Sequence, residues 1–180
     1  STIGQGLFRL DDRLTKAVSV DSMFQQVNCT YQSKFCIDSR SDIWIGTDGN
    51  GLARYVSGTK TLQYFKYPTF GDNNVTSILE DRSGNIFVGT QKQGVSRYDE
   101  VKGQMVPVHY EGDDKSVSVY CMAMVNGQIW VGTDGQGVKV YNPRKNRLED
   151  YKINSATVDF SKGKVHSIMQ DRDGKLCIGL

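Results

Sequence analysis

The chain has 180 residues, which is enough for one substantial core or for a few repeated units. Its 22 basic and 20 acidic side chains give a net charge of +2, and they are scattered without a long run of one sign. Nucleic-acid binding needs a clustered basic face, so we expect no nucleic-acid partner. No apolar stretch approaches the roughly 20 residues of a membrane-spanning helix, so we expect this chain itself to be soluble.

One phrase recurs along the chain. It consists of a short apolar run that ends in Gly-Thr, then three loop residues, then a second apolar run that opens with glycine. The glycine of the Gly-Thr pair recurs after 43, 43 and 47 residues, and a period of this size predicts one supersecondary unit that is stacked repeatedly. The three complete copies of the phrase are Ile43–Tyr55, Ile86–Tyr98 and Ile129–Tyr141.

Both ends of the sequence match halves of this unit. Thr2–Arg9 matches Thr47–Arg54, and Asp171–Gly179 matches Asp81–Gly89. We therefore expect one region over 1–180: a partial unit at 1–25, units at about 26–68, 69–112 and 113–157, and a partial unit at 158–180.

Two arrangements of these units are possible. The ends could pair and close a small ring, or the chain could be part of a longer array. We favour the longer array, because a domain seldom ends in mid-strand. Its open sheet edges should then pair with the remaining blades or with a second copy of the chain.

The unit over Val75–Tyr110 predicts four short antiparallel strands: Val75–Glu80, Ile86–Thr90, Gly94–Tyr98 and Gln104–Tyr110. The intervening Asp81–Asn85 is typical of a turn in which aspartate caps local amides and glycine takes a positive φ. No helical period is sustained anywhere. The fold class is therefore all-β, and about four blades' worth of four-stranded sheets indicates a β-propeller. A β-sandwich is the alternative, but it does not require a repeated phrase.

The repeated glycines and aromatic residues have a mechanical interpretation. Glycine late in the second strand suits a place where blades approach closely and a side chain would obstruct. The aromatic residue two positions before it should fill the space between neighbouring blades. Stacking against sugar rings is the alternative role for the tryptophans. The residues concerned are Gly46, Gly89 and Gly132, with Trp44, Phe87 and Trp130.

Taken together, the pattern Ser77-Ile78-x-x-Asp81-x-x-Gly84-x-Ile86-Phe87-Val88-Gly89-Thr90-x-x-x-Gly94-Val95-x-Arg97-Tyr98 resembles the two-component regulator propeller repeat. The resemblance covers nearly the whole chain, in five successive units. It departs from the pattern at Met124 in place of the turn aspartate, at Ser41 in place of the turn glycine, and at Val140 in place of the strand arginine.

This resemblance implies the periplasmic sensor region of a hybrid two-component histidine kinase of the Bacteroidetes type. Its members commonly sense oligosaccharides and signal to a kinase core that lies beyond a membrane helix. The resemblance therefore implies an oligosaccharide ligand, a membrane-anchored parent protein, no enzymatic activity in this chain and no cofactor.

Binding residues concentrate on loops that a rigid scaffold holds, and the loops between second and third strands are rich in carboxylate and amide groups that suit sugar hydroxyls. The same residue types are also ordinary turn formers. Arginines on the third strand could bind acidic sugars, or they could make a contact that each blade repeats; we favour the repeated contact. The candidate ligand-binding residues are Asp48, Asn50, Gln91, Lys92, Asp134, Gln136, Arg54 and Arg97.

The remaining reactive residues indicate no other chemistry. The four cysteines form no Cys-x-x-Cys pair and only two histidines are present, so we expect no metal site. We expect the cysteines to be apolar core residues, with disulfides as the alternative. No Gly-x-Ser-x-Gly nucleophile motif occurs. A sensing propeller is thus favoured, with a protein-interaction platform and a propeller lyase or hydrolase as rivals.

Overall fold

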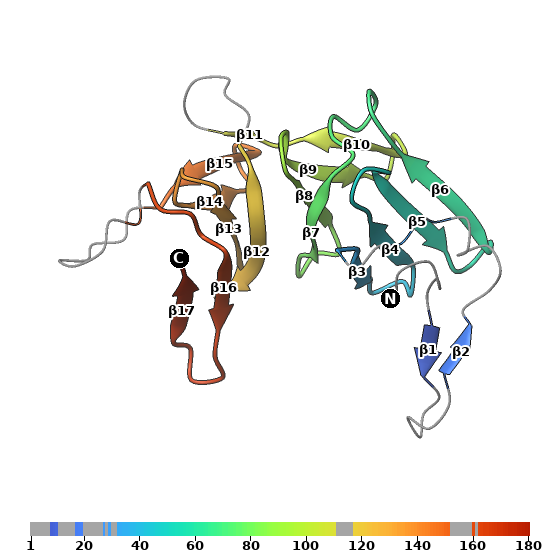
Figure 1. The fold of residues 1–180 in the computed structure, drawn as a ribbon, viewed down its shortest axis with the longest axis horizontal. Coiled ribbons are helices and arrows are strands. Elements are labelled where there is room, and N and C mark those ends of the chain that lie inside the picture. The colour runs from blue at the N-terminus through green and yellow to red at the C-terminus, as the bar shows by residue number, and fades with distance from the viewer. Residues whose placement is uncertain are drawn as a thin grey trace.

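The computed structural model describes residues 8–10, 17–19, 27, 29, 32–110, 117–151, 160 and 162–180, and every regular element among them is a β-strand (Figure 1). The strands form five sheets, of which two are four-stranded antiparallel blades and a third is a four-stranded antiparallel blade with one further strand at its edge. Blade 1 comprises β3 (Lys34–Ile37), β4 (Ile43–Gly46), β5 (Leu52–Val56) and β6 (Thr61–Phe65). Blade 2 comprises β7 (Val75–Glu80), β8 (Ile86–Thr90), β9 (Gly94–Asp99) and β10 (Gln104–Pro107). Blade 3 comprises β12 (Val119–Val125), β13 (Gln128–Thr133), β14 (Val138–Asn142) and β15 (Arg147–Asp150), with β11 (His109–Tyr110) added at its edge.

Two hairpins complete the described part of the chain. They are β1 (Phe8–Leu10) with β2 (Ala17–Ser19), and β16 (Ser167–Gln170) with β17 (Leu176–Gly179).

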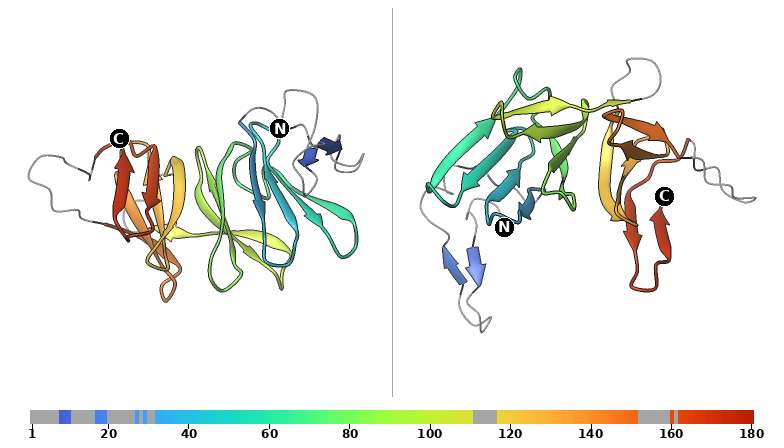
Figure 2. Two further views of the ribbon diagram at one scale, coloured as in Figure 1. Left: turned by 90° about the horizontal axis from the view of Figure 1, so that it is seen from below. Right: turned by 180° about the vertical axis from the view of Figure 1, so that it is seen from behind.

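The sheets are arranged radially. Each blade runs from its first strand to its fourth in sequence order, and the first strands β3, β7, β12 and β16 contact one another in succession. The blades therefore fan out from these inner strands along an arc, as two further views show (Figure 2). A sandwich would instead stack two sheets face to face. The fold is a β-propeller arrangement of blades, as predicted.

The end of blade 2 differs from the prediction of a single strand over Gln104–Tyr110. Gln104–Pro107 pairs with β9, but His109–Tyr110 pairs in parallel with β15 of blade 3. The backbone N–H of Val108 still bonds to Val95 of blade 2 at 2.9 Å, so the change of sheet falls directly after Val108. This crossing segment joins the outer edges of two blades.

The predicted close approach at the second-strand glycines is confirmed. In each blade this glycine lies against a valine that precedes or opens the inner strand of the next sheet. A Cβ atom on Gly89 would lie 2.7 Å from Cγ1 of Val119, well inside van der Waals contact. The three contacts pair Gly46 with Val75, Gly89 with Val119, and Gly132 with Val165.

Aromatic residues fill the spaces between blades, which confirms their predicted packing role. Trp44 is fully buried and meets the Tyr98 ring of blade 2 edge-on, with centroids 5.1 Å apart. Phe87 meets Tyr141 of blade 3 in the same way at 4.9 Å. Trp130 is buried with a cluster that includes residues of β16. The core is thus a series of interfaces between blades and not one central mass.

The turns between first and second strands also follow the prediction. In blade 2, one oxygen of Asp81 accepts the N–H groups of Ser83 and Asn85 at 2.8 and 2.9 Å, and Gly84 has φ +81°. Ser41 takes the glycine position of blade 1 with φ +67°. Blade 3 lacks the aspartate and turns instead through Asn126-Gly127, both with positive φ, a combination that favours a tight hairpin.

All four cysteines are free, so the alternative of disulfides is not realised. Cys29 is buried and Cys36 and Cys121 are half-buried, in line with a core role. The core prediction is wrong for Cys177, which is exposed. Cys177 holds the position of Trp44, whose face packs against the following blade, and among the described residues nothing covers that face of β17.

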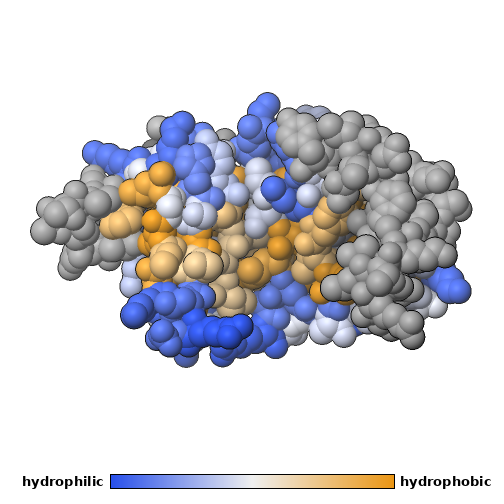
Figure 3. Space-filling model, turned by 60° about the horizontal axis from the view of Figure 1, so that its bottom comes forward, coloured by the Kyte–Doolittle hydropathy of each residue, from blue (hydrophilic) through white to orange (hydrophobic). Residues whose placement is uncertain are grey.

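Hydrophobic side chains are exposed on the inner strands. Phe35 and Ile37 of β3 are 36% and 70% exposed, and Met169 of β16 is 59% exposed. On the side that faces downward in Figure 1, hydrophobic surface gathers in a band between two hydrophilic margins (Figure 3).

Candidate functional site

The loops between second and third strands are held in one conformation by a threonine. In each blade the hydroxyl of the Gly-Thr pair donates to the carbonyl of the glycine four residues on, and it accepts the N–H of the third loop residue. Each threonine is buried, so the loop ends are fixed while their side chains project outward. The donor–acceptor pairs are Thr47 with Gly51 at 2.8 Å, Thr90 with Gly94 at 3.1 Å, and Thr133 with Gly137 at 2.7 Å.

The loops of blades 1 and 2 are also tied to the segment that enters blade 2. The carbonyl of Asn73 accepts the N–H groups of Gly49 and Gly51 at 3.1 and 2.9 Å, which anchors the blade 1 loop to the segment entering blade 2. The carbonyl of Asn74 accepts the N–H of Gln91 at 3.0 Å, which anchors the blade 2 loop to the same segment. The rim is therefore a continuous surface that several blades build together.

A pocket of about 430 Å³ opens on this rim, at the ends of the inner strands. It brings together two predicted residues, Asp48 of the blade 1 loop and Gln91 of the blade 2 loop. The remaining lining comes from the starts of three inner strands and their approaches: Gln32, Lys34, Asn74, Val75, Thr76 and Tyr120. We call this the rim pocket.

The polar groups of the rim pocket are only partly used by the protein. Asn74 donates its side-chain N–H to the side-chain oxygen of Gln91 at 3.0 Å, and the side-chain N–H groups of Gln91 form no hydrogen bond with a described residue. The Thr76 hydroxyl is buried without a hydrogen bond. Among the described residues, neither the Asp48 carboxylate nor the Lys34 ammonium forms an ion pair. The pocket thus offers both donors and acceptors to a polyhydroxylated molecule.

Asp134, the equivalent of Asp48 in blade 3, reaches the same pocket indirectly. It forms an ion pair with Lys164 at 3.0 Å. The hydrogen bond from Lys164, followed by one from Tyr120, lowers the pKa of the Asp134 carboxyl. Tyr120 lines the rim pocket, and its ring stacks on His166 with centroids 4.6 Å apart. Asp134 is therefore linked to the pocket only through Tyr120 and does not itself line it.

Three other predicted loop residues do not line the rim pocket. Asn50 and Gln136 each donate a backbone N–H to the loop threonine, at 3.0 and 3.1 Å. Lys92 donates its backbone N–H to Asp72 at 2.8 Å, and its side chain is exposed. Their roles in ligand binding stay predictions.

The residues that the sequence did not single out are those of the inner strands, above all Lys34 and Tyr120. No repeated phrase marks them. Their only signal is position, because each lies at or just before the start of a first strand, and these starts converge at the centre of a propeller.

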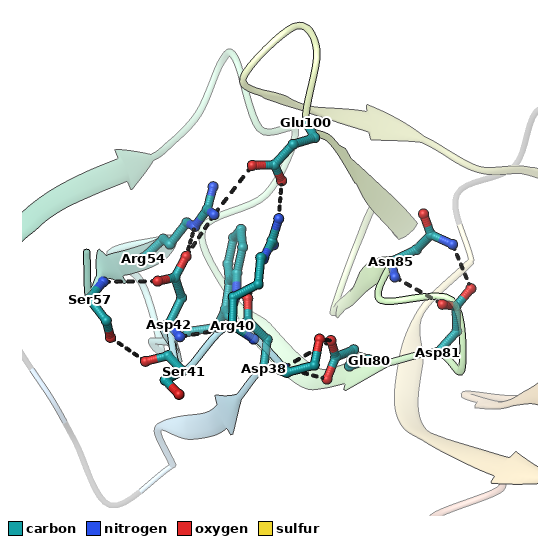
Figure 4. A network of polar contacts seen from close by, with 12 residues as sticks. Asp38, Arg40, Ser41, Asp42, Arg54, Ser57, Glu80, Asp81, Asn85 and Glu100 are labelled. Carbon is teal, nitrogen blue, oxygen red and sulfur yellow. Dashed lines mark hydrogen bonds and ion pairs between the residues drawn. The ribbon is translucent and has the colours of Figure 1, made fainter. Parts of the chain in front are cut away.

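Arg54 is buried between blades 1 and 2 (Figure 4). Its Nε and Nη2 atoms donate to one oxygen of Asp42 at 2.9 and 2.7 Å, and Nη2 lies 3.5 Å from Glu100 of blade 2. Its guanidinium carbon lies 5.0 Å from the Trp44 ring centroid and 4.9 Å from that of Tyr98. These contacts favour the structural interpretation of Arg54.

Arg97 holds the same position in blade 2 but is only half-buried. It lies between blades 2 and 3, outside the rim pocket, and its surroundings differ from those of Arg54. The structure therefore separates the two arginines that the sequence made equivalent.

Within the part of the chain that the structure describes, no three His, Cys, Asp or Glu side chains are grouped as metal ligands. Nor does that part contain a helix with the length and hydrophobicity to cross a membrane.

Residues 69–92 match the family model described as "Two component regulator propeller". This segment runs from the entry of blade 2 through β7 and β8 to the loop that carries Gln91 and Lys92. The chain carries a two-component regulator propeller repeat. No curated protein sequence matches the chain.

Solved structures share the fold of this chain. Two are described as the extracellular domains of hybrid two component systems of B. thetaiotaomicron, BT3049 and BT4673, each with 20% identity and a TM-score of 0.75. The alignments cover 99% and 97% of this chain, but only 23% and 22% of those chains. The virginiamycin B lyase from Staphylococcus aureus is also similar, with 12% identity and a TM-score of 0.67 over 97% of this chain and 56% of the lyase. The chain thus spans less than a quarter of the length of the two extracellular domains.

Proposed function

We propose that the chain is part of an extracytoplasmic sensor of a hybrid two-component system, and that its rim pocket recognises an oligosaccharide. One observation carries the proposal: loops and inner strands of three successive blades place Asp48, Gln91 and Tyr120 around one pocket. Sugar hydroxyls need donors and acceptors at fixed positions, and the threonine-held loops supply them. The likeness to extracellular domains of hybrid two component systems supports the same role.

The proposed role is binding without chemistry. A ligand that contacts several blades at once stabilises one arrangement of those blades over another, and such a shift in populations is sufficient for signalling. In the parent protein, this change would pass across the membrane to a kinase core.

A glycan array with the purified chain, followed by calorimetric titration of each hit, tests the proposal. We expect saturable binding of an oligosaccharide, no product after prolonged incubation, and an affinity at least about tenfold lower in Asp48→Ala and Gln91→Ala, because each loses a hydrogen bond to the ligand. Asp173→Ala is the matched control, since Asp173 is exposed in the turn at the opposite end of the strands. Turnover of the glycan would overturn the binding role, and equal affinity in all variants would overturn the site.

A further inference from the structure

Arg54 and Arg97 occupy the same position in successive blades, and Arg54 shows what this position accepts. Its Nε and Nη2 atoms both donate to Asp42, which belongs to the same blade, and Glu100 of the next blade approaches from the other side. The guanidinium is thus saturated by carboxylates from within the protein.

In blade 2 both carboxylates are absent. The repeat aligns Asp42 with Asn85 and Glu100 with Pro143, so neither position around Arg97 carries an acid. Asn85 carries a neutral amide, whose N–H donates to Asp81 at 2.8 Å. Blade 3 has no unpaired arginine at this position, since Val140 replaces the arginine.

Arg97 is consequently left without a partner. Its Nε atom is buried and makes no hydrogen bond, and its guanidinium forms no ion pair with any residue that the structure describes. A buried N–H without an acceptor is unfavourable, so this atom favours an acceptor from outside the chain.

The acceptor has space to enter. A pocket of about 390 Å³ lies between blades 2 and 3, and we call it the interblade pocket. Two guanidinium groups line it, those of Arg97 and Arg82, together with one carboxylate, that of Asp81. The Asp81 oxygens accept hydrogen bonds from the amides of Ser83 and Asn85. Two positive groups thus face one negative group, so the pocket favours an anion.

The remaining lining is polar and aromatic. Asn85, Gln128 and Asn146 contribute amides, and Phe87 and Tyr141 contribute rings. Burial raises the pKa of Tyr141, the charge of Arg97 lowers it and the charge of Asp81 raises it. The phenol therefore stays neutral, and it donates to Asn146 at 3.0 Å. No second negative charge therefore competes for Arg97.

We propose that the interblade pocket binds the carboxylate of a sugar acid. Arg97 would donate to that carboxylate as Arg54 donates to the carboxylate of Asp42. The carboxylate takes the place that an internal acid fills in blade 1, and the amides and rings receive the hydroxylated body of the ligand. The pocket is lined by the turns at the opposite ends of the strands from the rim pocket, so this inference does not depend on the proposed sensing site.

The Arg97 Nε–Hε signal in ¹H–¹⁵N spectra of the whole chain reports on the proposal directly. It is assigned by its loss in Arg97→Gln. Titration with glucuronate is expected to shift it saturably, while glucose, which has the hydroxyls but no carboxylate, leaves it in place. Acetate is expected to bind at least tenfold more weakly than glucuronate, because it has the carboxylate alone. The Arg54 signal is the matched control and should not move, since Asp42 already occupies that guanidinium.

Asn85→Asp gives a second test that does not remove the arginine. It places a carboxylate where blade 1 has Asp42, so it should shift the Arg97 signal without any ligand and lower glucuronate affinity at least tenfold. An Arg97 signal unmoved by glucuronate, or unchanged glucuronate binding in Asn85→Asp, overturns the proposal. Equal affinity for acetate and glucuronate overturns the sugar-acid part of it.

Discussion

Trp44 and Trp130 hold the same position in their blades but differ in hydrogen bonding. The indole N–H of Trp44 donates to Asp38 at 2.9 Å, whereas that of Trp130 is buried without a partner. The reason lies in one residue, because Met124 stands in blade 3 where blade 1 has Asp38. The same side chain therefore satisfies its polar atom in one blade and not in the other.

We predict that Trp44→Phe destabilises the chain by about 1–3 kcal/mol more than Trp130→Phe. The first substitution removes a hydrogen bond to a buried carboxylate, and the second removes an N–H that has no acceptor. Urea unfolding followed by far-ultraviolet circular dichroism measures both, and each variant serves as the control for the loss of ring volume in the other. Equal losses of unfolding free energy would contradict the role of Asp38.

At the scale of the strands, the spacing between blades is set by glycine. Gly89 of β8 leaves no room for a side chain beside Val119 of β12. We predict that Gly89→Ala lowers the free energy of unfolding by about 1–3 kcal/mol, because the added methyl group forces β8 of blade 2 and β12 of blade 3 apart. Chemical denaturation provides the measurement.

Gly58→Ala is the matched control for this substitution. Nothing lies within 4 Å of a Cβ at Gly58, and its φ is not in the left-handed region. A surface change of this kind should stay within about 0.5 kcal/mol. If Gly89→Ala were equally mild, the blades would not be in the contact that the structure shows.

Repetition explains which elements the sequence could predict. Strand positions, glycine contacts and aromatic packing recur in every blade, so each copy supports the others. The threonine of the Gly-Thr pair also recurs in every blade. Sequence reasoning did not use this recurrence, although it indicates that the threonine holds the loop in place. The crossing of His109–Tyr110 to blade 3 is not marked by any repeated residue, because a short apolar run can pair with the sheet of either blade.

The candidate site was only partly predictable for the same reason. Asp48 and Gln91 stand out because they belong to the repeated loops. Lys34 and Tyr120 do not repeat, and they meet in the rim pocket only because inner strands of different blades converge. Arg97 shows the converse case: its equivalence with Arg54 pointed to a shared structural role, but substitutions at Asn85 and Pro143 removed the partners that the role requires.

At the scale of the whole molecule, a radial stack makes ligand binding and blade placement interdependent. The rim pocket draws its lining from blades 1, 2 and 3, so a bound ligand contacts elements that otherwise meet through glycine–valine contacts, aromatic contacts and a few polar contacts. Small changes at these contacts would alter the curvature of the arc. The same geometry leaves hydrophobic side chains of the inner strands exposed, and one face of the molecule carries a hydrophobic band (Figure 3).

We therefore predict that the purified chain self-associates. Ile37 on β3 and Met169 on β16 are both more than half exposed, and burying such side chains against a second copy contributes about 1.5–3 kcal/mol each. Size-exclusion chromatography with light scattering should give a mass near twice the 20.1 kDa of one chain. Ile37→Lys should shift the population toward monomer, while Val101→Lys, at a 97% exposed turn position, should leave it unchanged. A compact monomer at all concentrations would instead indicate that the arc closes on itself and leaves no inner strand to cover.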